Sequence, residues 1–341
     1  MGLMELPIHL GPRNPELLTL QKYHKNQAIW DRVELRPLRC RSHIRVLEDF
    51  DVDDRVVEFL RGTHFFGIHR FVSMKFYVDL ISSLVELWRQ ETHTFHLPVG
   101  EVTVTLKDVQ VLLGLAINGD VVSGSTYQNP VKSVEMALGL APTDDDLSGT
   151  ALKIGLLVRN FRGLPNNVSE EVLHNHVRAY LLILFGIVLY PDKSRSDVQV
   201  IWLPLLSDLD HLDKYSWGSM PATLYRNLCR ASRVRAIDIG GPLILLQIWA
   251  WERISIGRPN NLRPRYEAWE PNANPFGSQH QIRVDLLGCR WLRIERKRPS
   301  GPSSFRGYGD ALDSMTNDHF IWQHYTEEIM FFLSDECKSQ P

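Results

Sequence analysis

Apolar residues recur every three or four positions along much of the chain, which is the spacing of an amphipathic helix. The clearest run begins after Ser169, a residue type that caps helix N-termini, and continues into the apolar stretch 179–190. The run 243–254 is almost wholly apolar and predicts a helix at the centre of the core. Further helices are predicted at 51–60, 73–88, 198–209 and 222–230.

The most regular local pattern is a strand, a turn, a second strand and a capped helix. Two short β-prone runs, 95–97 and 102–104, are separated by a Pro and a Gly and predict a hairpin. Thr105 follows, with Asp108 three residues on, which is the spacing of a capping box. Apolar residues at helical spacing then continue as far as Gly114, which predicts the end of that helix.

These elements predict a mainly α fold, a single helical domain with a small β-hairpin and a few short strands. No internal repeat of roughly 20–50 residues is visible, which disfavours solenoids and propellers. Residues 1–45 mix prolines with arginines and predict an irregular N-terminal arm, 46–335 form the domain, and 336–341 form a C-terminal tail. The Pro- and Asn-rich segment 259–275 predicts a loop, and the aromatic segment 320–325 a short strand.

Composition favours an ordinary globular, intracellular protein. With 44% hydrophobic and 23% charged residues the chain can bury a substantial core. Cys40, Cys229, Cys289 and Cys337 form no CxxC pair, so we expect free thiols in a reducing compartment and neither a disulfide framework nor a zinc site. The stretch 179–190 is shorter than the roughly 18–20 residues that span a bilayer, so we expect a buried helix and no membrane partner.

Charge is distributed unevenly along the chain. Residues 226–306 contain fifteen Arg or Lys and six Asp or Glu, a net charge of +9, while the whole chain carries -2. Such asymmetry predicts a basic face for an acidic partner or a phosphate backbone. Pairing of these arginines with the acidic remainder of the same chain explains the asymmetry equally well, and both interpretations stay open.

Several short motifs invite a catalytic or metal-binding interpretation. The string GDVVSG at 119–124 resembles part of a metallophosphatase site, but no further GDxHG or GNHE string supplies the other ligands, so Asp120 is interpreted as a turn residue. His93 and His96 point to opposite faces of a strand. The run 144–146 of three aspartates is interpreted as a solvated loop or helix start. We therefore expect no catalytic residues, no metal and no cofactor.

Tryptophans near arginines are the other candidate chemistry. They could stack on unpaired bases or contact a partner, although core packing is the favoured interpretation because they lie within apolar helical runs. Trp249 and Trp251 are two positions apart and cannot share one helix face, so one of them needs a second packing surface, such as a partner. The possible partner contacts are Trp217, Arg226, Arg230, Trp249, Trp251 and Arg253.

Three long strings together resemble the plant mobile domain family. They are WRQETHTFHLPVGEVTVTLKDVQVLLGLAINGDVVSG at 88–124, YSWGSMPATLYRNLCRAS at 215–232 and LLQIWAWERISIGRP at 245–259. The resemblance covers the chain from about residue 50 to about residue 325.

The resemblance implies a biological setting more than a chemistry. Family members occur in plant transposable elements and as host proteins similar to the maintenance-of-meristems proteins, which are nuclear and are implicated in transposon silencing, genome integrity and meristem function. Host members act with a phosphatase-seven-like protein, and some relatives carry the domain fused to such a phosphatase. The family is also described as aminotransferase-like, but Lys75, Lys107 and Lys153 lie on predicted amphipathic helices and no phosphate-binding loop accompanies them.

The sequence therefore predicts a non-catalytic nuclear interaction module that acts with a phosphatase-like partner. The alternative is direct DNA or RNA binding through the basic C-terminal half, and the third possibility is a cryptic metal-dependent nuclease or hydrolase. The possible nucleic-acid contacts are Arg290, Arg293, Arg296, Lys297, Arg298 and Arg306.

Overall fold

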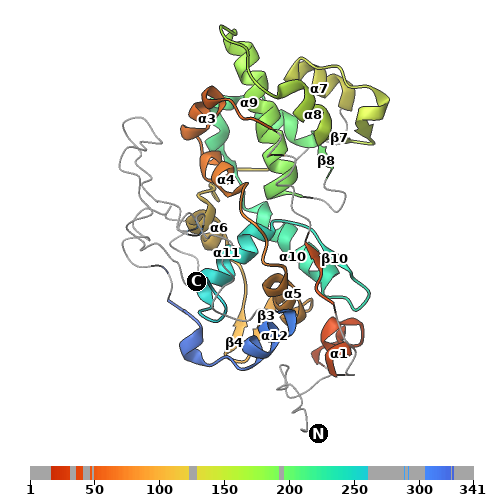
Figure 1. Cartoon of the computed structure of the whole chain (residues 1–341), viewed down its shortest axis with the longest axis vertical. Coiled ribbons are helices and arrows are strands. Elements are labelled where there is room, and N and C mark those ends of the chain that lie inside the picture. Colours follow the sequence, from red (N-terminus) through yellow and green to blue (C-terminus); the bar gives the residue numbers. More distant parts are fainter. Residues whose placement is uncertain are drawn as a thin grey trace.

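Short helices joined by strands of two to four residues build the chain, as the periodicity predicts (Figure 1). The fold is mainly α, a single helical domain with a small hairpin and a few short strands. The computed structural model describes residues 17–30, 36–40, 47, 50–122, 129–191, 196–259, 288, 291, 304–323 and 325.

The longest described helix, α9 (Glu170–Leu184), organises one end of the molecule (Figure 1). Ser169 caps it by accepting a hydrogen bond from the Val172 N–H, which confirms the predicted helix start. Its last turn continues directly into a π-helical segment, Phe185–Leu189. The helices packed around α9 are α3 (Asp54–Arg61), α4 (Phe65–Phe71), α7 (Pro130–Leu138) and α8 (Ile154–Phe161).

The run Glu170–Leu189 is long and apolar enough to cross a membrane by length and composition. The core helix of a folded domain meets the same criterion. Here residues 179–189 are all buried inside the fold, so packing against the surrounding helices accounts for their hydrophobicity.

The helix α11 (Leu243–Arg253) is the core of the other half, as predicted. Every residue from Leu243 to Glu252 is buried, and the helix packs on α5 (Val78–Leu87) and α6 (Leu106–Leu113). Trp249 stacks on Phe95 with ring centroids 5.2 Å apart. Burying one large aromatic side chain stabilises a fold by about 2–3 kcal/mol, so α11 contributes strongly to the core.

The predicted hairpin is present and gains a third strand. β3 (Thr94–Leu97) pairs antiparallel with β4 (Gly100–Val102) and with β2 (Trp88–Arg89). Thr105 and Asp108 form both hydrogen bonds of the capping box, and Gly114 ends α6 at a φ of 72°. The predicted start and end of this helix are therefore confirmed.

Two predicted elements are wrong. Residues 198–209 form no amphipathic α-helix but a strand, β8 (Asp197–Gln199), followed by the 3-10 helix η5 (Val200–Leu206). Pro204 lies inside η5 and has no N–H to donate, which disfavours a continuous α-helix there. Among the described residues of the segment 320–325, Phe320 forms an isolated bridge with Ile254 and there is no strand.

Other helices begin elsewhere than predicted or were not predicted. α5 begins at Val78 and α10 (Ser219–Ala231) begins before the predicted 222. The helix α12 (Phe305–Asp313) was not predicted, and only two of its side chains, Tyr308 and Leu312, are buried. Nearly all of the predicted loop 259–275 lies outside the described residues.

The described part of residues 1–45, predicted as an irregular arm, is built into the domain. It contains the 3-10 turn η2 (Gln21–Tyr23), α1 (Lys25–Trp30) and β1 (Arg39–Cys40). β1 pairs in parallel with β10 (Asp238–Ile239), and the Leu38 side chain is buried. Backbone pairing and core contacts therefore fix this segment against the helices.

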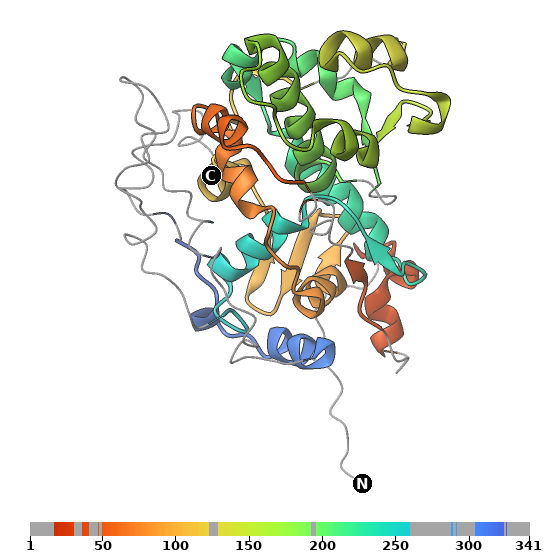
Figure 2. The same ribbon diagram turned by 45° about the horizontal axis from the view of Figure 1, so that its top comes forward.

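α12 packs against α5, where the two helices lie side by side (Figure 2). Two acids, Glu86 of α5 and Asp313 of α12, interact at this contact. The Ser83 hydroxyl of α5 donates to the Phe305 carbonyl of α12 over 3.1 Å. Burial, reinforced by the charge of Asp313, raises the pKa of Glu86 to about 8. Burial likewise raises the pKa of Asp313 to about 6. The folded chain therefore holds protons at this contact that the unfolded chain releases.

This contact predicts a loss of stability with rising pH. Because the pKa of Glu86 is raised on folding, its contribution is complete below pH 4.5 and is lost as pH rises through about 8. We expect Glu86→Gln to be more stable than the wild type at pH 9, by on the order of 2–4 kcal/mol, with little difference at pH 5. Urea unfolding at pH 5, 7 and 9 measures this difference.

The matched control is Glu135→Gln, which removes an exposed carboxyl from α7. It should follow the wild-type profile at all three pH values. Parallel pH profiles for the wild type and Glu86→Gln would contradict the assignment.

Candidate functional site

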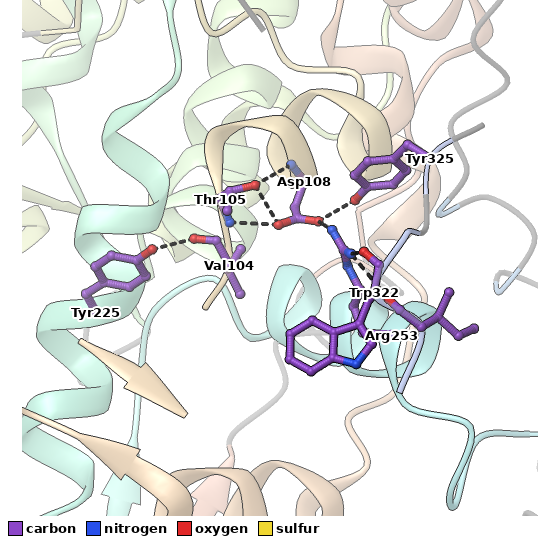
Figure 3. A network of polar contacts seen from close by, with 8 residues as sticks. Val104, Thr105, Asp108, Tyr225, Arg253, Trp322 and Tyr325 are labelled. Carbon is purple, nitrogen blue, oxygen red and sulfur yellow. Dashed lines mark hydrogen bonds and ion pairs between the residues drawn. The ribbon is translucent and has the colours of Figure 1, made fainter. Parts of the chain in front are cut away.

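The Asp108 carboxylate is completely buried in the first turn of α6 (Figure 3). Its Oδ2 accepts hydrogen bonds from the Thr105 N–H at 2.7 Å and from the Thr105 hydroxyl at 2.8 Å. Its Oδ1 accepts from Arg253 Nη2 at 3.1 Å and from the Tyr325 hydroxyl. Donors from three separate segments therefore converge on one carboxylate.

Arg253 supplies the positive charge of this network from the last turn of α11. Its side chain is only 15% exposed. Its Nη1 donates to the Trp322 carbonyl at 3.0 Å, and its guanidinium lies over the Tyr325 ring with 5.0 Å to the centroid. An unpaired buried carboxylate costs several kcal/mol, so Arg253 offsets a charge that the fold has removed from water.

Tyr325 takes part as a hydrogen-bond donor. Burial, followed by the negative charge of Asp108, raises the pKa of the Tyr325 hydroxyl well above its usual value. The hydroxyl therefore stays protonated at neutral pH and donates to the carboxylate.

A second tyrosine extends the polar contacts toward α10 (Figure 3). The Tyr225 hydroxyl donates to the Val104 carbonyl, directly before the Thr105 cap. It also accepts from the Thr103 hydroxyl at 3.1 Å. α10 is thus tied to the strand that leads into α6.

This arrangement ties distant segments together. A carboxylate has about four lone-pair positions, and the four donors on Asp108 occupy them. The Arg253 guanidinium is shared between that carboxylate and backbone carbonyls. The groups bind one another, so the network acts as an internal clamp between α6, α11 and the segment around Tyr325.

The three predicted partner-contact tryptophans are interior residues. Trp217, Trp249 and Trp251 are 0%, 1% and 2% exposed. Trp217 packs edge-on against Phe65 with centroids 5.0 Å apart. Their burial confirms the favoured core-packing interpretation and leaves no side-chain surface for a base or a partner, which corrects their assignment as contacts.

The second packing surface expected for the Trp249 and Trp251 pair is also internal. Trp249 stacks on the hairpin residue Phe95, whereas Trp251 packs against Tyr77, with centroids 5.0 Å apart, and against Trp291, with centroids 5.1 Å apart. Opposite faces of α11 therefore meet different parts of the same chain, and no partner is needed to cover either ring.

The arginines predicted to contact a partner or a nucleic acid lie in different environments. Arg226 and Arg230 are exposed on α10, and Arg306 is exposed on α12. Arg253 lies in the internal clamp, so its assignment as a partner contact is corrected. The remaining predicted nucleic-acid contacts lie outside the described residues: Arg290, Arg293, Arg296, Lys297 and Arg298.

The first residues of the GDVVSG string, at 119–121, have a structural role. Asp120 is exposed on β5 (Asp120–Val121), which pairs in parallel with β9 (Tyr215–Ser216). Gly119 has a φ of 118°, and a Cβ there would lie 2.3 Å from the Lys214 carbonyl oxygen. Only glycine allows this close approach of two backbones.

The other candidate metal ligands also have local roles. His96 Nε2 lies 3.3 Å from Glu101 Oε2 across the hairpin. The Asp146 carboxylate, in the 3-10 turn Asp144–Asp146, accepts a hydrogen bond from the Thr143 N–H. Within the described ranges, no group of three or more His, Cys, Asp or Glu residues is placed to hold a metal ion.

The family model of the plant mobile domain matches residues 65–340. The chain belongs to the plant mobile domain family. Three similar proteins from Arabidopsis thaliana extend the comparison. The chain is 40% identical to Serine/threonine-protein phosphatase 7 long form homolog, over 99% of this chain and 25% of that protein.

Two further relatives match this plant mobile domain chain. It is 34% identical to Protein MAIN-LIKE 2, over 98% of this chain and 48% of that protein. It is 33% identical to Protein MAINTENANCE OF MERISTEMS, over 70% of this chain and 50% of that protein. The chain thus spans between a quarter and about half of these relatives, and no solved structure matches it.

Part of the clamp could be predicted from the sequence. Thr105 and Asp108 were predicted as a capping box, and Arg253 was noted beside the tryptophans. Their contact spans 145 residues, and no local pattern indicates a pairing at that separation. Tyr325 was noted only as part of an aromatic segment.

The clamp predicts strong, non-additive effects of mutation. Asp108→Asn leaves a buried guanidinium unpaired, and Arg253→Met leaves a buried carboxylate unpaired, so each should cost about 3–5 kcal/mol of unfolding free energy. The double variant should cost clearly less than the sum, because neither charge is then buried alone. Urea unfolding of the four proteins gives the coupling energy.

The exposed pair Glu58 and Arg61 on α3 provides the matched control. Glu58→Gln and Arg61→Met should each change stability by less than about 1 kcal/mol and should show little coupling. Equal coupling in the two cycles would show that Asp108 and Arg253 do not form a clamp.

Proposed function

We propose that this plant mobile domain chain is a non-catalytic nuclear interaction module that acts with a phosphatase-like partner protein. The observation that carries the proposal is the closed clamp around Asp108. The buried Asp108 carboxylate and the Arg253 guanidinium satisfy one another and hold α6 against α11. Such a junction stabilises the fold as a scaffold, whose outer surface can then bind a partner protein.

The relatives support the choice of partner. A segment similar to 99% of this chain makes up a quarter of a longer protein named as a phosphatase 7 long form homolog. Modules that share one chain work at high effective concentration. We therefore propose a phosphatase-like protein as the partner of this chain.

The relatives also support the biological setting. The name MAINTENANCE OF MERISTEMS connects one relative to meristems. We place this chain in the same setting, in the nucleus, with roles in transposon silencing and genome integrity.

A second candidate function is direct binding to DNA or RNA. It is favoured by a row of exposed arginines on α10, Arg226 and Arg230, and by Arg233 and Arg235 in the turn that follows. Phosphate contacts from such a row give affinity without sequence preference.

Affinity purification of the tagged chain from plant nuclei tests the first proposal. We expect a phosphatase among the co-purified proteins, in amounts absent from a purification with the tag alone. A fluorescent fusion should accumulate in nuclei. Recovery of no phosphatase, or a fusion excluded from nuclei, would contradict the proposal.

A gel-shift titration with a labelled duplex tests the second candidate. If the arginine row binds phosphate, affinity should fall by on the order of tenfold or more between about 50 and 200 mM salt, and Arg226→Glu/Arg230→Glu should weaken it. Absence of a shift even at the lower salt concentration would remove nucleic-acid binding as a function.

A further inference from the structure

Backbone hydrogen bonds join the turn after α10 to two parts of the N-terminal segment. The Val234 N–H donates to the Tyr23 carbonyl at 2.8 Å, and the Lys25 N–H donates to the Ser232 carbonyl at 2.7 Å. On the other side of the turn, the Arg39 N–H donates to the Ile237 carbonyl at 2.9 Å. Backbone hydrogen bonds therefore hold the three segments side by side.

This surface is strongly basic. Residues 226–237 contain four arginines and no acidic residue. All four are exposed, and so are Lys22 and Arg39 on the paired segments. No ion pair joins any of these six side chains to a carboxylate among the residues that the structure describes. We call the surface formed by Lys22, Tyr23, Arg39, Arg226, Arg230, Arg233, Val234, Arg235 and Ile237 the basic face.

Two acids on or beside the paired segments, Glu91 and Asp238, have other positions or partners. Glu91 accepts a hydrogen bond from the Leu20 N–H at 2.8 Å, at the start of the N-terminal segment. Asp238 is partly buried in β10, opposite Arg39 in the strand register. The basic face therefore keeps a clear excess of positive charge.

Apolar side chains lie among these cations. Tyr23, Val234 and Ile237 are 53%, 42% and 64% exposed. They are three of the eight large exposed hydrophobic residues in the described chain, and the backbone hydrogen bonds bring all three to this face. Exposed apolar groups gathered at one place mark protein contacts more often than isolated ones do.

We propose that the basic face binds a segment of the partner protein in which acidic and aliphatic residues are interspersed. Charge complementarity selects an acidic partner, because six exposed cations form no ion pair with a carboxylate among the residues that the structure describes. The aliphatic side chains favour a protein over a nucleic acid, since Val234 and Ile237 have no counterpart on a phosphate backbone. This inference rests on the proposed function, that the chain works by binding a partner protein.

Peptide titration tests the chemistry of the face. The probe is a fluorescent peptide of alternating Glu and Leu, and binding to the full chain is followed by anisotropy. We expect Arg226→Glu/Arg230→Glu to weaken binding at least tenfold. A matched double reversal on other elements, Lys132→Glu/Arg162→Glu, should leave it unchanged.

Two further probes separate the alternatives. A peptide with Ser in place of Leu should bind more weakly, because only the charges remain. Equal affinity for the two peptides, or tighter binding of a single-stranded oligonucleotide, would overturn the proposed occupant.

The same variants in the nuclear purification separate this inference from the proposed function. Loss of the phosphatase with Arg226→Glu/Arg230→Glu, but not with the control, supports both. Equal recovery by the two variants overturns the basic face as the docking surface and leaves the proposed function standing. No recovery by the wild type counts against the proposed function, and the peptide titration then decides the basic face by itself.

Discussion

The burial of the Asp108 carboxylate is the constraint on which the junction of this fold depends. A carboxylate that caps a helix from inside the protein must be neutralised where it lies. Arg253 and Tyr325 meet this requirement from positions 145 and 217 residues away. If α6 moved away from α11, the buried carboxylate and guanidinium would each lose their partner, so the capping box takes part in a long-range contact.

The same requirement explains how other segments are fixed. His24 is buried with Nδ1 accepting the Asn26 N–H and Nε2 donating to the Trp88 carbonyl, and burial together with the charge of Arg89 lowers its pKa to about 4. Gln247 of α11 donates to the Lys75 carbonyl and accepts from the Tyr77 N–H. Polar side chains thus tie the N-terminal segment and the entry to α5 onto the apolar core.

Residues close together in the sequence predicted individual helices well, but they could not predict contacts between distant segments. The Ser169 and Thr105 caps and the Gly114 end were correct because each depends on neighbours within a few residues. α12 was missed because two buried side chains make too weak a periodic pattern. Pro204 made a helix-like run a 3-10 segment. The clamp was missed because its partners meet only after the chain has folded.

The side of the helix on which an arginine lies decides whether it pairs inside the fold or faces solvent. Arg253 follows the buried run of α11, and its side chain reaches α6, where it pairs with the Asp108 carboxylate. Arg226 and Arg230 are four residues apart on α10, on the face opposite Leu224 and Leu228, which enter the core. The tryptophans that the sequence places near these arginines, Trp217, Trp249 and Trp251, are interior. These arginines therefore have two kinds of position: Arg253 stabilises the fold, whereas Arg226 and Arg230 lie on the exposed side of α10, where we propose that a partner binds.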